Sequence, residues 1–126
     1  MVMILFEFFT DNTNVEWSHA MTGIAGDKGL NFITTGHDKD KEPGMTALIN
    51  GQLQYGYTIR ELNHSHPQNT TPYPSGISGF TGETGDVQWA GEVCKIFGNN
   101  VKFNIYTPKN GKYIQFSPNS KKSDYF

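Results

Sequence analysis

The sequence predicts an α+β fold in which a mixed or antiparallel sheet carries at least one packed helix. Several segments alternate apolar and polar residues as strands do, and one later segment has the periodicity of an amphipathic helix. The dipeptide Asn110-Gly111, set between two β-rich segments, is a strong signal for a hairpin. The 126 residues suffice for one core, so we assign residues 1–120 to a single domain and 121–126 to a frayed tail.

The first residues, MVMILFEFF, form a nearly continuous apolar run. No Lys or Arg precedes the run and no small-residue cleavage site follows it, so the pattern does not match a signal peptide. The run is also too short to span a bilayer. We therefore expect a first core strand or a short buried segment, and no membrane insertion of the domain.

Three segments have the alternation of strands, namely residues 13–21, 30–36 and 55–66. In the first of them, Val15 and Trp17 share one face, and Glu16 and Ser18 share the other. The segment 67–85 is rich in Pro, Gly, Ser and Thr. A loop of this length inside a small domain is typically functional or disordered.

Residues 86–97 predict the one convincing helix of the chain. Asp86 stands where an N-cap is expected, and Gly98 supplies the stop. The apolar face of this helix comprises Val87, Ala90, Val93, Cys94 and Phe97. The expected order is three strands, a long loop, a helix and a hairpin.

Charge and cysteine content exclude several classes of function. Ten Lys and Arg stand against twelve Asp and Glu, which gives a net charge of −2 and no basic footprint for nucleic acid. Cys94 is the single cysteine, so disulfides within the chain and cysteine-rich zinc sites are excluded. Any metal must therefore be held by His, Asp and Glu.

His64 and His66, in the sequence His-Ser-His-Pro, are the centre of the predicted site. Alternate residues of a strand point to the same side, so both imidazoles project from one face, close enough to share a tetrahedral zinc. A catalytic zinc takes three protein ligands and keeps its fourth position open. The third ligand is expected to be a carboxylate.

Asp86 is the best candidate for this carboxylate, because it opens a helix directly after the glycine-rich loop. Glu83, within the loop, is the weaker candidate. A general base is also needed, and Glu16 fits because it lies on the polar face of an earlier strand. Glu16 and His19 would form half of an E-x-x-H metal motif on a helix, but the second half is missing and the segment predicts a strand.

This pattern resembles the signature of the JAMM (JAB/MPN) metalloproteases, in which a glutamate precedes H-x-H-P, a serine and an aspartate. Glu16, residues 64–67, Ser75 and Asp86 carry the resemblance. More narrowly, the chain resembles the JAB-like toxin domains at the C-terminal ends of bacterial Rhs-type polymorphic toxins, in which a stretch like residues 12–19 precedes the HSHP segment. The resemblance implies the α+β layering of JAB/MPN domains, which is similar to that of cytidine deaminases.

The resemblance implies His64, His66 and Asp86 as the ligands of one Zn²⁺ per chain. It implies Glu16 as the general base that takes a proton from the zinc-bound water, and Ser75 as a donor to the developing oxyanion. The implied reaction is hydrolysis of a peptide or isopeptide bond. The three metal ligands, the base and the serine together make up the expected catalytic site.

One departure from the family signature concerns the spacing of the last two positions. The signature places serine and aspartate three residues apart, whereas Ser75 and Asp86 are eleven apart. The intervening residues are turn-formers that can loop out, which affects the ligand set less than the serine. Ser78 is an alternative to Ser75 for the serine role.

Three aromatic residues are expected to contact substrate: Tyr73 and Phe80 in the long loop, and Trp89 near the start of the helix. Each of them could instead pack within the fold.

We therefore expect a zinc-dependent metallopeptidase or isopeptidase domain, delivered as the toxin module of a larger exported bacterial protein and acting in a target cell. The expected partners are a protein or peptide substrate and an immunity protein. Two alternatives remain open. One is a catalytically silent JAB-like module that binds a partner protein, and the other is a zinc hydrolase with a non-peptide substrate.

Overall fold

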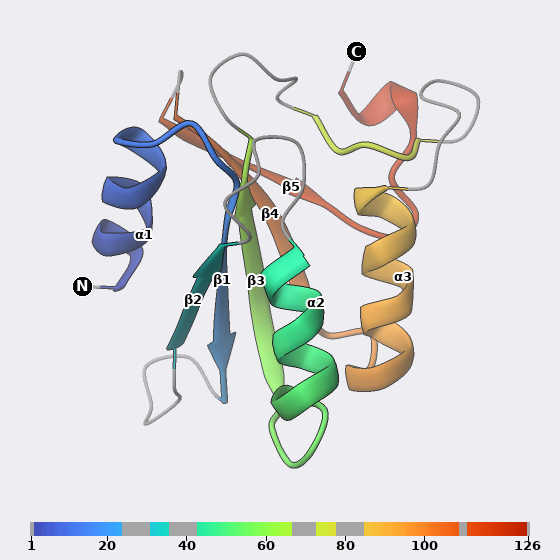
Figure 1. Cartoon of the computed structure of the whole chain (residues 1–126). Helices are drawn as coiled ribbons and strands as arrows, with labels where there is room; N and C mark the ends of the chain where they lie inside the picture. The colour runs from blue at the N-terminus through green and yellow to red at the C-terminus, as the bar shows by residue number, and fades with distance from the viewer. Residues whose placement is uncertain are drawn as a thin grey trace.

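The computed structural model describes residues 2–23, 31–35, 43–66, 73–77, 85–108 and 111–125. The elements in chain order are α1 (Val2–Asp11), β1 (Trp17–Thr22), β2 (Asn31–Thr35), α2 (Pro43–Leu48), η1 (Ile49–Leu53), β3 (Ile59–Ser65), α3 (Asp86–Phe97), β4 (Lys102–Thr107), β5 (Lys112–Phe116) and η2 (Lys122–Asp124). The strands form one mixed sheet in the order β2-β1-β3-β4-β5 (Figure 1). The predicted α+β class with a mixed sheet is confirmed.

The direction of the strands explains where the functional residues meet. β3 and β4 are parallel, whereas the other neighbouring pairs are antiparallel. Two parallel strands need a crossover connection, and α3 supplies it. The crossover begins beyond the carboxyl end of β3, which carries His64, and α3 starts at Asp86.

The main core lies between the sheet and the layer formed by α2, η1 and α3, which Figure 1 shows on one side of the strands. Alternate strand residues supply the sheet side of this core: Ala20, Leu62, Phe103, Ile105 and Phe116. Met45, Ile49, Leu53, Ala90 and Val93 supply the helical side. The α2 and η1 segment was not predicted, because it is short and its sequence contains Pro and Gly.

The N-terminal segment is helix α1, so the expectation of a strand there is wrong. Phe6 is fully buried on the other face of the sheet, where its ring contacts His19 and Tyr106 with centroids 5.6 and 6.0 Å apart. The carbonyl oxygens at the end of α1 accept hydrogen bonds from the side chains of Asn12 and Thr13. A continuous apolar run fits a buried strand and a buried helix equally well, so periodicity could not separate them.

The chain continues past β5. Lys122–Asp124 form a short 3₁₀ helix, and the expectation that residues 121–126 fray stays a prediction. The Tyr125 ring packs against the core, and its hydroxyl donates to the Gln115 carbonyl at 3.1 Å. Among the helices of the described ranges, none is long and apolar enough to cross a membrane.

His19 in β1 is fully buried and uncharged near neutral pH. Its Nε2–H donates to Asn31 Oδ1 at 3.1 Å, and its Nδ1 faces the Asn63 amide at 3.5 Å. Burial lowers the pKa of His19 below its usual 6.5. The bond to Asn31 and the charge of Glu61 oppose that effect, and the charge of Arg60 adds to it.

Acid should therefore destabilise the fold as the pH falls below about 6.5, because the unfolded chain takes up a proton at His19 that the folded protein resists. The contribution of neutral His19 to the free energy of unfolding is fully present above the pKa that His19 has in the unfolded chain. It decreases as the pH falls towards the lower pKa of His19 in the folded protein, by at most about 1.4 kcal/mol per pH unit. Urea unfolding of the metal-free protein across this window measures the slope. In His19→Gln the slope should be shallower, and equal slopes in both proteins would contradict the prediction.

Candidate metal centre

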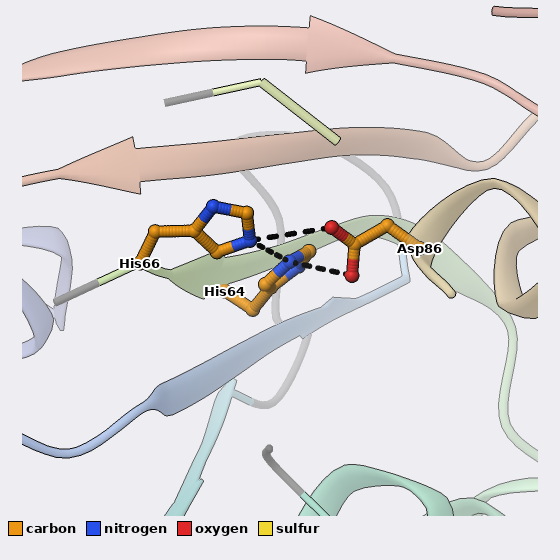
Figure 2. A group of neighbouring side chains, drawn as sticks. All are labelled: His64, His66 and Asp86. Atoms are coloured by element: carbon orange, nitrogen blue, oxygen red, sulfur yellow. Dashed lines mark hydrogen bonds and ion pairs between the residues drawn. The ribbon is translucent and has the colours of Figure 1, made fainter. Parts of the chain in front are cut away.

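Three side chains converge where β3 ends and α3 begins (Figure 2). His64 Nε2 lies 3.3 Å from His66 Nε2. The same nitrogen of His64 lies 3.1 Å from Asp86 Oδ1, and that of His66 lies 3.2 Å from Asp86 Oδ2. The ligand atoms all lie within 4.8 Å of one another, so this group could hold a metal ion.

The backbone at the end of β3 explains why both imidazoles face the same point. His66 follows the last residue of β3, and its N–H donates to the Tyr106 carbonyl of β4 at 3.0 Å. This bond continues the parallel ladder past Ser65 and keeps the chain extended. His64 and His66 are alternate residues of that extended segment, and they therefore project from one face.

The distances in this group fit a tetrahedral ion better than a set of direct hydrogen bonds. Ligands about 2.0–2.1 Å from a tetrahedral zinc are separated by about 3.3–3.4 Å, close to the values found here. Asp86 oxygens accept but do not donate, so direct bonds to both imidazoles require a proton on each Nε2. Two N–H groups would then face each other at 3.3 Å. A cation held by this group would instead receive a lone pair from each of the three side chains.

Asp86 is the first residue of α3, and the N-cap is Gly85, which corrects the expectation that Asp86 is the cap. The Asp86 N–H donates to Ser75 Oγ at 2.9 Å, and the Val87 N–H donates to the Ser75 carbonyl at 3.1 Å. In return the Ser75 N–H donates to Asp86 Oδ2 at 2.9 Å. Ser75 thus satisfies the first amides of the helix, which leaves the Asp86 carboxylate facing the histidines.

The base of the long loop is closed by a second set of contacts. Gln88 Nε2 donates to the Gly76 carbonyl at 2.7 Å, and the Gly85 N–H donates to Gln88 Oε1 at 2.8 Å. A Cβ atom at Gly85 would overlap Ser75 Oγ, and Gly76 has a φ of +83° that favours glycine. The eleven-residue spacing therefore brings Ser75 and Asp86 into direct contact.

The electrostatics of the group favour an ionised aspartate. Burial by itself raises the pKa of Asp86, but the charges and hydrogen bonds of His64 and His66 outweigh it and hold this pKa well below its usual value. The amino end of α3 also favours a negative charge. An ionised carboxylate next to two imidazole nitrogens is a donor set that suits zinc.

A cavity of about 90 Å³ adjoins the metal group. Residues of β1 and β3 and the neighbouring Glu16 line it together with residues of α2 and α3. The lining residues are Glu16, Ser18, Met45, Thr46, His64, Asp86 and Trp89. Glu16 is 8% exposed and lies just before β1, on the same side of the sheet as His64. The structure therefore brings Glu16 to the cavity beside the three converging side chains.

Trp89 of α3 forms a hydrogen bond to α2, and both helices border this cavity. Its Nε1–H donates to Thr46 Oγ1 of α2 at 3.2 Å, and its ring lies edge-on to His64 and Phe103. Trp89 therefore packs against the core and lines the cavity. Met45 and Thr46 were not predicted as site residues, because no pattern in the sequence indicated α2.

The other predicted residues are placed as follows. Ser75 is exposed and contacts Asp86 from the outside, but it is not among the residues that line the cavity. Tyr73 is half-buried and does not line it either. Phe80, Ser78 and Glu83 lie outside the described residues.

A family model described as JAB-like toxin 1 matches residues 2–91, which is well over half of the chain. The match begins in α1, ends within α3, and includes Glu16, His64, His66 and Asp86. No curated protein sequence matches the chain. The family match and the grouped H-x-H and aspartate side chains agree, and the chain belongs to the JAB-like toxin 1 family.

Proposed function

We propose that this domain is a zinc-dependent hydrolase of peptide or isopeptide bonds, which serves as the toxin module of an exported bacterial protein. One observation carries the proposal. The Nε2 atoms of His64 and His66 and the Asp86 carboxylate converge at ligand distances, while Glu16 lines the adjoining cavity. The three converging residues would hold the zinc, and Glu16 would be the base.

When bound, zinc supplies a Lewis acid that polarises the substrate carbonyl and lowers the pKa of a coordinated water. Glu16 takes one proton from the attacking water, whose oxygen forms the new bond to the carbonyl carbon. The C–N bond then breaks, and Glu16 returns that proton to the leaving amine. Ser75 holds the Asp86 carboxylate in place through its backbone N–H.

A second candidate is a module that binds zinc and a partner protein without catalysis. It is favoured by one observation, since the Ser75 hydroxyl accepts from the Asp86 amide and does not line the cavity. The serine that the family resemblance assigns to the oxyanion is therefore not placed on the cavity wall. An immunity protein that covers the cavity remains a predicted partner.

Metal analysis and peptide hydrolysis together test the proposal. Purified protein should contain about one zinc per chain, and it should cleave members of a mixed peptide and isopeptide library. Removal of zinc by a chelator should abolish cleavage, and added zinc should restore it. A folded protein that takes up no zinc after reconstitution would contradict the metal site. Full zinc loading without cleavage would favour the binding module.

A further inference from the structure

Ser18 in β1 places a hydroxyl in the cavity that nothing in the mechanism above uses. The residue is only 3% exposed, and it lines the cavity together with Glu16, His64 and Asp86. Within the part of the chain that the structure describes, its hydroxyl makes no hydrogen bond. Among the described residues, Arg60 Nε is the side-chain polar atom that is inaccessible to solvent and has no hydrogen-bond partner. The Ser18 hydroxyl has no partner among them either, yet it is not inaccessible in this way, so it must be reached from the cavity that Ser18 lines.

The hydroxyl of Ser18 is therefore available to a molecule that enters the cavity. Polar groups removed from water are almost always hydrogen-bonded, because an unsatisfied group loses its solvation without compensation. The neighbouring Ala20 of β1 is fully buried and apolar, as the core side of this strand favours. A polar side chain on this otherwise apolar side of the strand, facing a cavity, is typical of a group that contacts a ligand.

The register of the sheet defines what the hydroxyl faces. Ser18 pairs directly with His64 across the antiparallel β1 and β3. Side chains of directly opposed residues lie on the same face, about 4.5–5.5 Å apart at Cβ. Glu16 is two residues earlier and shares that face. The Ser18 hydroxyl therefore lies between the proposed base and a proposed zinc ligand.

We propose that Ser18 donates a hydrogen bond to the oxyanion that forms at the substrate carbonyl, the role that the family resemblance assigns to Ser75. This inference rests on the proposed hydrolase function. As water adds to the carbonyl carbon, the carbonyl oxygen gains negative charge, and the Ser18 O–H donates to it. When the C–N bond breaks, the charge returns to the carbonyl and the hydrogen bond weakens. Ser75 instead positions Asp86.

Ser18→Ala tests this role with three measurements on the zinc-loaded protein. Its kcat should fall about 100- to 1,000-fold with little change in KM, since a donor to the oxyanion acts mainly in the transition state. Its zinc content should equal that of the wild type. Its unfolding temperature should be close to that of the wild type, because the Ser18 hydroxyl makes no hydrogen bond within the described residues. Ser18→Thr keeps the hydroxyl and should recover part of kcat.

Ser75→Ala is the matched control, because it also removes one serine hydroxyl near the site. It should lower zinc affinity and the unfolding temperature, since Ser75 supports Asp86 and the start of α3. Wild-type kcat in Ser18→Ala would overturn the inference and leave the hydrolase proposal intact. A lowered unfolding temperature with no recovery in Ser18→Thr would mark Ser18 as structural and would also overturn it.

Binding of a phosphinic dipeptide separates the inference from the hydrolase proposal. The tetrahedral P–O⁻ group of this probe imitates the oxyanion, and calorimetry needs no turnover. Ser18→Ala should bind it at least about tenfold more weakly than the wild type does. If the wild type cleaves no peptide, the hydrolase proposal fails and the oxyanion role fails with it, and weaker binding in Ser18→Ala then shows only a hydrogen bond from Ser18 to a bound anionic oxygen. Equal affinity in both proteins, or no binding to the wild type, overturns the inference.

Discussion

Glu16→Gln should lower kcat by about 100- to 10,000-fold without loss of zinc, the range by which a positioned general base accelerates proton transfer. Glutamine has nearly the shape of glutamate, so the wall of the cavity should keep its form. It cannot take a proton from water at neutral pH. Kinetics on a peptide that the wild type cleaves, together with metal analysis of both proteins, measure the effect.

Glu92→Gln is the control for this substitution. The Glu92 side chain is 69% exposed on α3 and pairs with Lys95, and it does not line the cavity. Its neutralisation should leave both kcat and zinc content near their wild-type values. Glu16→Gln with wild-type kcat and full zinc would show that another group is the base. Loss of zinc in Glu16→Gln would show that Glu16 is itself needed to hold the metal.

Asp86→Asn should bind zinc much more weakly than the wild type does. Residues that only support a metal ligand typically contribute about 10- to 100-fold to affinity, and a direct ligand should contribute more. The substitution replaces the anionic ligand, yet an amide oxygen can still accept from the Ser75 N–H. The fold should therefore survive. Asp86→Ala should lose the metal and also this hydrogen bond, and its metal-free form should unfold at a lower temperature. Competition with a chromogenic chelator measures the affinity, and thermal unfolding measures the fold.

Asp124→Asn provides the comparison, because Asp124 is an exposed carboxylate of η2 away from the cavity. It should bind zinc as the wild type does. If Asp86→Asn also keeps wild-type affinity, the proposed ligand set is wrong, and the proximity of Asp86 to the histidines reflects hydrogen bonding alone. If both Asp86 variants fail to fold, Asp86 is needed for folding. The metal assignment is then tested by the same measurements on variants of His64 and His66.

The parts of this fold that follow from local pattern were predicted from the sequence. Helix α3 was recognised by its apolar spacing and by Gly98, which has the positive φ expected at such a stop. Helix α1 was not, because its mostly apolar sequence, interrupted by Glu7, was interpreted as a core strand or a short buried segment. Segment 43–53 was missed for a related reason, since its helical turns are short and carry Pro and Gly. These two helices pack on opposite faces of the sheet, which only the tertiary structure reveals.

For the candidate site, too, local sequence patterns predicted some features, whereas others depend on tertiary structure. The H-x-H spacing predicts that two imidazoles share a face, because strand geometry alone requires it. The contact between Ser75 and Asp86 depends on how the loop closes, and no spacing rule specifies that. The cavity wall formed by Met45 and Thr46 depends on the docking of α2. The roles of all these residues in catalysis stay predictions until the variants above are measured.

The closure of the loop at Ser75, Gly76, Gly85 and Gln88 has a consequence for how this domain can diversify. Hydrogen bonds among these four residues and Asp86 hold the two ends of the loop together on either side of residues 78–84. Because Ser75 contacts Asp86 directly, we expect the position of Asp86 to depend on these closing contacts more than on the length of the loop. Related domains could then carry loops of different length beside the same candidate metal centre.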